Sequence, residues 1–286
     1  MEKTINEALG YICEGRTREA IEMAGLFDEW YHKTAQIGKD ITDGFGHYGL
    51  VCDGIMRKRN ISDEKLENDW WEGPMRIAFL MKDQNQKGDV YNTDARNWLL
   101  QKDKAWELQN KTFHNIANIL WGLIHATKDY PCFPAEMNTQ FNEIKHCFQT
   151  RPFAYIECKK QGGGPKIDDN VLKNYMTDYK ELLYKEFNIL KPNVFVCTSG
   201  IIFDFVKQYL QDKYALKADE EFTPVISNKD KSKYEQNILL HMPSKSIILL
   251  GYHPTVRKSY ETIYEGVMDH YRAFVQSEHF QDFFDK

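Results

Sequence analysis

Residues 247–255 read Ile247-Ile248-Leu249-Leu250-Gly251-Tyr252-His253-Pro254-Thr255. The continuous apolar run at the start of this stretch predicts a strand that is buried on both faces, as strands of parallel sheets are. The Gly-Tyr-His-Pro that follows predicts a turn that brings a histidine to the edge of the sheet. Ligands of α/β proteins bind at that edge. We therefore expect an α/β fold with a functional site near His253.

Three other apolar runs precede this one, at residues 76–81, 153–158 and 193–198. Helical stretches separate them, among them 172–190 and 201–210. This alternation predicts a three-layer αβα domain at 71–286, with a central four-stranded, mainly parallel sheet. In residues 1–70 apolar side chains recur among charges at helical spacing, which predicts a helical N-terminal extension.

Composition restricts the class of protein. The 286 residues carry a formal net charge of −5, so broad phosphate neutralisation is not expected, and DNA or another nucleic acid would bind to a local basic face.

Six scattered cysteines without a Cys-x-x-Cys pair indicate neither a zinc site nor an iron–sulfur cluster, and we expect no metal or cofactor. Without an apolar signal region or a run of roughly 20 apolar residues, we expect a cytoplasmic protein with no membrane contact. The oligomeric state stays open.

The first run ends in Lys82-Asp83-Gln84-Asn85. A carboxylate at the end of a strand can orient a water molecule or stabilise positive charge in a transition state, so Asp83 is a candidate catalytic residue. Gln84 and Asn85 are candidate ligand contacts. The structural alternative is that Asp83 caps the next turn or helix.

His253 is the second candidate catalytic residue. Pro254 has a fixed φ, which stiffens the turn and holds the imidazole in one direction. The alternative is a partly buried histidine that is hydrogen-bonded to a backbone carbonyl.

The second run leads into Glu157-Cys158-Lys159-Lys160-Gln161-Gly162-Gly163-Gly164-Pro165-Lys166. Glycines let backbone N–H groups approach a phosphate, so this stretch predicts a phosphate loop made by Lys159, Lys160, Gly162, Gly163, Gly164 and Lys166. It lacks the Walker pattern of a nucleoside triphosphatase, and a flexible connector is the alternative.

Glu157 lies where a strand end would face a cleft. An ionised carboxylate accepts hydrogen bonds but donates none, which favours an amino group of a ligand over a carbonyl. The alternative is a surface glutamate paired with Lys159 or Lys166. Tyr91, Trp98 and Tyr252 can stack on a base, although most aromatic side chains of such a chain belong to the core.

In their order along the chain, the strand ends resemble those of the uracil-DNA glycosylase superfamily, over about residues 75–275. Phe79-Leu80-Met81-Lys82-Asp83-Gln84-Asn85 is similar to the water-activating segment of that family, residues 191–200 to its third strand, and Tyr252-His253-Pro254-Thr255 to its closing His-Pro-Ser. The family usually has glycine before its acid, where this chain has Lys82. Its uracil enzymes tend to carry Asn at the base-reading position, where this chain has Glu157.

The resemblance implies a glycosylase that acts on a base rotated out of its stack. Asp83 would position water, His253 would stabilise the leaving base, and Glu157 would read the base. Ser199, Arg257 and Lys258 would bind phosphates. One other hypothesis is a non-catalytic module of the same fold that binds a nucleotide or a nucleic acid. Another is an unrelated nucleotide- or sugar-phosphate-binding α/β protein that uses residues 162–164 as its phosphate loop.

Overall fold

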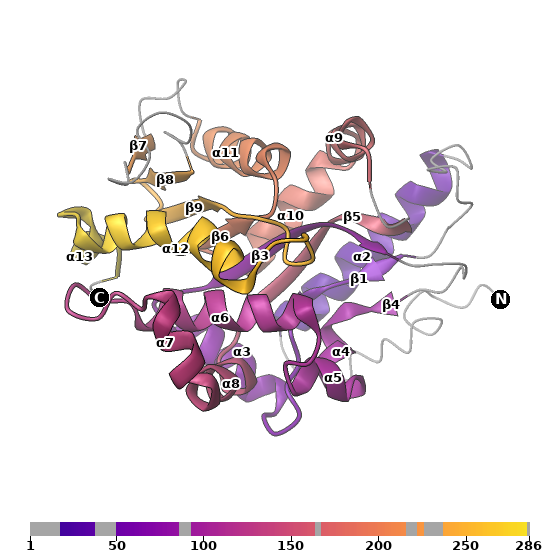
Figure 1. Ribbon diagram of the computed structural model, residues 1–286. Coiled ribbons are helices and arrows are strands. Elements are labelled where there is room, and N and C mark those ends of the chain that lie inside the picture. The colour runs from indigo at the N-terminus through magenta and orange to yellow at the C-terminus, as the bar shows by residue number, and fades with distance from the viewer. Residues whose placement is uncertain are drawn as a thin grey trace.

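The computed structural model describes residues 18–37, 50–85, 93–163, 167–215, 222–225 and 237–284. In these ranges the chain forms three layers, with helices on both faces of a central sheet (Figure 1). The predicted α/β class is confirmed. Within the same ranges, no helix combines the length and the apolar character needed to cross a membrane.

The main sheet is mixed and larger than predicted. Four neighbouring strands are parallel: β5 (Ala154–Gly163), β3 (Ile77–Asn85), β6 (Val194–Cys197) and β9 (Ser246–Leu250). Antiparallel strands extend both edges: β2 (Gly54–Ile55) beside β5, then β8 (Ile238–His241) beside β9 and β7 (Phe222–Pro224) beside β8. The prediction of a four-stranded sheet was therefore wrong, because the described sheet has seven strands. The edge strands have two to four residues, too few for a hydrophobic pattern to reveal them.

A separate pair of short parallel strands is formed by β1 (Val51–Cys52) and β4 (Thr93–Asp94).

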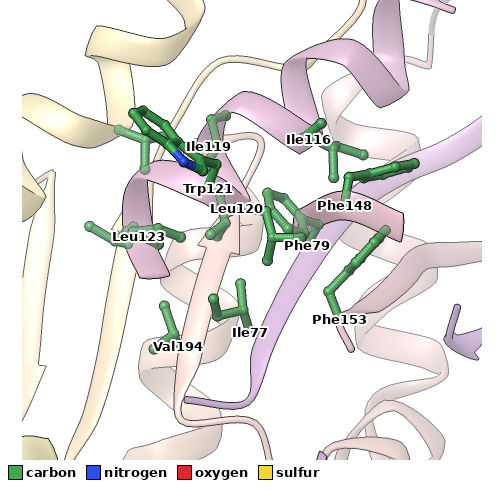
Figure 2. Close-up of a cluster of buried hydrophobic side chains, with 14 of the residues drawn as sticks. Ile77, Phe79, Ile116, Ile119, Leu120, Trp121, Leu123, Phe148, Phe153 and Val194 are labelled. Carbon is green, nitrogen blue, oxygen red and sulfur yellow. The ribbon is translucent and has the colours of Figure 1, made fainter. Parts of the chain in front are cut away.

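Alternate residues of the central strands point into two cores. Ile77, Phe79 and Met81 of β3 belong to the first core, and Ala78 and Leu80 to the second. Figure 2 shows the first core, where residues of β3 and β6 meet helix α6 and two phenylalanines: Ile77, Phe79, Val194, Ile116, Leu120, Phe148 and Phe153.

Different helices cover the two faces. The first core is covered by η1 (Ala95–Asn97), α4 (Trp98–Gln101), α5 (Asp103–Trp106), α6 (Lys111–His125), α7 (Pro134–Thr139), α8 (Phe141–Thr150), α12 (Tyr260–Gln276) and α13 (His279–Phe284). The second is covered by α2 (Arg18–Ile37), α3 (Asp63–Glu72), α9 (Asp169–Asp178), α10 (Lys180–Leu190) and α11 (Gly200–Tyr214).

The N-terminal region, predicted as a helical extension, shares the core of the rest of the chain where it is described. Phe27 and Trp30 of α2 and Trp70 of α3 are buried in the second core. Helix α2 packs along α10, and β2 continues the main sheet. The region is therefore helical only in part.

The connections after β3 and β6 leave the sheet on opposite faces. The chain after β3 passes through α4–α8 on the first face, whereas the chain after β6 enters α11 on the second. Because β3 and β6 are neighbours, the sheet changes its winding direction between them. In open α/β sheets a ligand crevice lies at the carboxyl ends of such a strand pair.

Candidate functional site at the carboxyl edge of the sheet

The carboxyl ends of β3, β6 and β9 are joined by hydrogen bonds. The hydroxyl of Thr198, after β6, donates to the carbonyl oxygen of Leu80 in β3 at 2.8 Å. The backbone N–H of Gly251, after β9, donates to the carbonyl oxygen of Cys197 at 2.8 Å. The segments that carry Asp83, Ser199 and His253 therefore leave one edge of the sheet side by side.

His253 is half-buried, and its hydrogen bonds fix its tautomer. Nδ1 accepts the backbone N–H of Thr255 at 3.3 Å and lies 2.8 Å from the hydroxyl of the same residue. A nitrogen that accepts an N–H carries no proton, so the proton of the neutral ring is on Nε2. Burial, assisted by the charge of Lys82, lowers the pKa of His253 to about 4. Near pH 7 the ring is therefore neutral, with its proton on Nε2. Its partner at Nδ1 is Thr255 and not the backbone carbonyl of the structural alternative.

Helix α6 holds the turn that follows His253. The side-chain amide of Asn115 donates to the carbonyl oxygen of Pro254 at 2.7 Å. One helical turn earlier, the ammonium group of Lys111 donates to the carbonyl oxygens of Val256 at 2.8 Å and Lys258 at 3.3 Å. Sequence reasoning missed both residues. For Asn115 the available signal was an amide in an otherwise apolar stretch of the chain, since buried polar groups are normally hydrogen-bonded.

Tyr252 is fixed from two sides. A Cβ atom on Gly266 of α12 would lie 2.8 Å from the Tyr252 ring, so the ring rests directly on the helix backbone. The ammonium group of Lys258 lies 4.7 Å from the centroid of the same ring. Tyr252 thus contributes to the rigidity of the turn, while Arg257 and Lys258 are exposed at its end.

Asp83 lies within β3, beside Lys159 of β5, and the pairing of these strands is irregular between Asp83 and Asn85. Such irregularities often occur next to active sites, where they redirect side chains. The side chains of Asp83, Gln84 and Asn85, and the whole of Tyr91, lie outside the described residues. The preceding residue, Lys82, donates to a carboxylate oxygen of Asp169 in α9 at 2.8 Å.

The predicted phosphate loop requires correction. Strand β5 continues through Gly162 to Gly163, so Lys159 and Lys160 are strand residues. Both are buried: Lys159 donates to the carbonyl oxygen of Gln161 at 2.9 Å, and Lys160 is fully enclosed between two carboxylates. Neither ammonium group is accessible to a phosphate, so these two lysines do not belong to a phosphate loop. Gly164 and Lys166 lie outside the described residues.

Lys160 belongs to a fully buried network. Its Nζ lies 2.6 Å from Asp53 Oδ1 and 2.8 Å from Glu186 Oε2. Burial, together with the charge of Asp53, raises the pKa of Glu186 well above its usual range. For Lys160 burial alone would lower the pKa, but the two carboxylates outweigh it and the net direction is upward. Perturbed groups can indicate a functional site. Here they bind one another beneath Trp30, and the network is structural.

Glu157 is also a strand residue, and only 1% of it is exposed. The hydroxyl of Tyr155 donates to Glu157 Oε1 at 3.0 Å. The Tyr155 ring in turn lies edge-on to Trp98, with 5.6 Å between the ring centroids, in the first core. The alternative of a surface glutamate is therefore wrong. Trp98, a candidate for stacking on a base, is a buried residue of the first core.

Ser199 is the N-cap of α11, and its hydroxyl oxygen accepts the backbone N–H of Ile202 at 3.4 Å. A Cβ atom on the next residue, Gly200, would meet nothing within 4 Å. The first turn of α11 thus opens onto free space beside the switch between β3 and β6.

In the described parts of the chain, no three His, Cys, Asp or Glu side chains group together in a way that could hold a metal ion. No family model, curated protein or solved structure matches this chain. The function of the site therefore has to be inferred from its own geometry.

Proposed function

We propose that the protein is a nucleic-acid base glycosylase, which hydrolyses the N-glycosidic bond of a nucleotide rotated out of its stack. The observation that carries this proposal is the neutral His253, whose ring carries its proton on Nε2 and is held in a rigid turn at the carboxyl edge of the sheet. Enzymes gain most from donors that are already oriented toward the position where negative charge develops. The resemblance of the strand ends to the uracil-DNA glycosylase superfamily supports the same assignment.

In the proposed reaction the glycosidic bond breaks and its electron pair leaves with the base. A base oxygen gains charge and accepts the Nε2–H of His253. Asp83 orients the attacking water, stabilises the positively charged sugar, and takes the proton that the water loses as it adds to the sugar carbon. Neither residue needs a metal ion for these roles.

Glu157 does not supply the choice of base in this proposal. Only 1% of it is exposed, and its carboxylate receives the hydrogen bond of Tyr155 in the first core, so it is as inaccessible to a ligand as Lys159. The preferred base is therefore determined by the release assay.

The test is base release from labelled single- and double-stranded oligonucleotides that carry uracil, hypoxanthine, xanthine or alkylated bases. We expect Asp83→Asn and His253→Ala each to lower the rate by about tenfold or more. His32→Ala, an exposed histidine on α2, is the matched control and should leave the rate unchanged. No release from any substrate by the folded protein would contradict the proposal.

A second candidate is a module of the same fold that binds nucleic acid without cleaving it. Lys82 favours this candidate, because its charge reaches His253 and a cation opposes positive charge on a sugar. Tight binding without turnover, weakened by His253→Ala, would select this candidate over the enzyme.

A further inference from the structure

Three aromatic rings form a row beside the His253 turn, with an exposed ring on each side of a half-buried histidine. The His114 ring of α6 stacks on Tyr260 of α12, with 4.5 Å between the centroids and 26° between the planes. On the other side, the centroid of the His114 ring lies 6.3 Å from the ring centroid of Phe141 in α8. Tyr260 is 44% exposed and Phe141 42%. We call these three residues the aromatic row.

The row is built where the beginnings of three helices meet. Tyr260 and Phe141 are the first residues of α12 and α8, and His114 lies in the first turn of α6. Helix α6 packs against both of the other helices and lies between them in Figure 1. Aromatic side chains that are exposed next to one another, rather than singly, are typical of binding surfaces.

The row is continuous with the candidate site. Only residues 254–259 separate His253 from Tyr260, and this segment carries the exposed cations Arg257 and Lys258. Lys111 of α6 binds two carbonyl oxygens of the segment, so the cations and the rings are attached to one rigid support. Glu261 is the acidic residue in the first turn of α12, directly after Tyr260.

We propose that the aromatic row is a stacking surface for unpaired bases of a single-stranded nucleic acid, whose phosphates bind Arg257 and Lys258. Aromatic side chains bind bases of any sequence through the flat face of the ring, and cations beside them follow the phosphates. In a duplex the faces of the bases are already stacked on their neighbours, so this surface selects an unpaired strand. The inference deepens the proposed function, on which it rests for the location of the reacting nucleotide at His253.

The test measures binding of labelled strands of about 15 nucleotides to the full chain by fluorescence anisotropy. DNA and RNA of one sequence, the matching DNA duplex and a mononucleotide are the probes. We expect a strand to bind more tightly than the duplex or the mononucleotide. Tyr260→Ala and Phe141→Ala should each weaken strand binding by about fivefold to a hundredfold. Tyr260→Phe should restore it, while Tyr260→Leu, which keeps bulk but lacks the ring, should not.

Trp71→Ala is the matched control. Trp71 is 38% exposed, but it lies on α3, which leads into the opposite, amino end of β3. We expect this variant to bind like the wild type. Arg257→Gln should reduce the slope of log affinity against log salt concentration by the amount expected for about one phosphate contact. Glu261→Gln should tighten strand binding, because it removes a negative charge next to Tyr260.

Strand binding that is unchanged in Tyr260→Ala and Phe141→Ala would overturn the inference, as would equal affinity for strand and duplex. Base release is measured separately. If the protein binds strands through the aromatic row but releases no base, the proposed catalysis is wrong and the stacking surface stands. If Tyr260→Ala and Phe141→Ala release bases at the wild-type rate and bind strands with wild-type affinity, the proposed catalysis stands and the proposed stacking surface is wrong.

Discussion

The side-chain amide of Asn115 donates a 2.7 Å hydrogen bond to the carbonyl oxygen of Pro254, the residue that follows His253. The two residues are 139 positions apart in the chain, and only 1% of Asn115 is exposed. The bond joins helix α6 to the turn after β9, across the first face of the sheet. The orientation of His253 therefore depends on a residue that no motif around His253 contains.

Asn115→Ala removes this bond and leaves the Pro254 carbonyl without its donor. We expect a loss of about 1–3 kcal/mol in the free energy of unfolding, because an unpaired buried polar group costs its desolvation. Urea denaturation measures the loss, and the chemical shifts of the His253 imidazole report whether the ring has moved. Asn142→Ala, at an exposed position of α8, is the control. If the chemical shifts of the His253 imidazole are unchanged in Asn115→Ala, Asn115 does not position His253.

Lys160→Met leaves Asp53 and Glu186 buried without their cation. We expect a destabilisation of about 3–5 kcal/mol, the usual effect of breaking a buried ion pair from one side. Adding Asp53→Asn and Glu186→Gln should recover part of the loss, because the remaining groups are then neutral. Lys180→Met is the matched control: its partner Asp212 is about one third exposed, and such a pair contributes about 0–1 kcal/mol. Similar losses in both lysine variants would contradict the assignment of Lys160 to a structural network.

Acid should destabilise the protein partly through two histidines. Burial lowers the pKa of His241 and of His253 to about 4, against about 6.5 in an unfolded chain. Between these pH values the unfolded state binds more protons, so stability falls as the pH decreases from about 6.5 to about 4. Urea midpoints across this range should decrease less in His241→Gln and His253→Gln than in the wild type, compared at each pH. Equal pH dependence in all three proteins would show that the rings titrate normally.

Two glycine substitutions should have opposite effects. In Gly266→Ala the new Cβ would lie 2.8 Å from the Tyr252 ring, which must move, so we expect a loss of about 1–3 kcal/mol. Gly25 lies within α2, where a Cβ meets nothing within 4 Å. Gly25→Ala should therefore stabilise the protein by about 0.5–1 kcal/mol, because alanine loses less conformational freedom in a helix. Thermal unfolding compares the two, and a stable Gly266→Ala would show that the ring adapts.

The apolar runs located the central strands because burial on both faces requires an unbroken apolar sequence. The run at 153–158 illustrates the limit of this signal. Strand β5 continues to Gly163 through Lys159 and Lys160, residues that a local pattern assigns to a loop. The second of these lysines is buried because of Asp53, 107 residues before it, and Glu186, 26 residues after it.

By itself the sequence determined the α/β class, the positions of the four parallel strands and the stiff turn at His253, since each depends on residues that are adjacent in the chain. The tertiary structure alone decided which polar groups are buried and which remain exposed. It gave His253 its tautomer, held its turn through Asn115 and Lys111, enclosed Lys160, and aligned His114 with Tyr260 and Phe141. Hydrophobic patterns are read over a few neighbouring residues, whereas hydrogen bonds, ion pairs and ring stacks join residues that only the folded chain brings together.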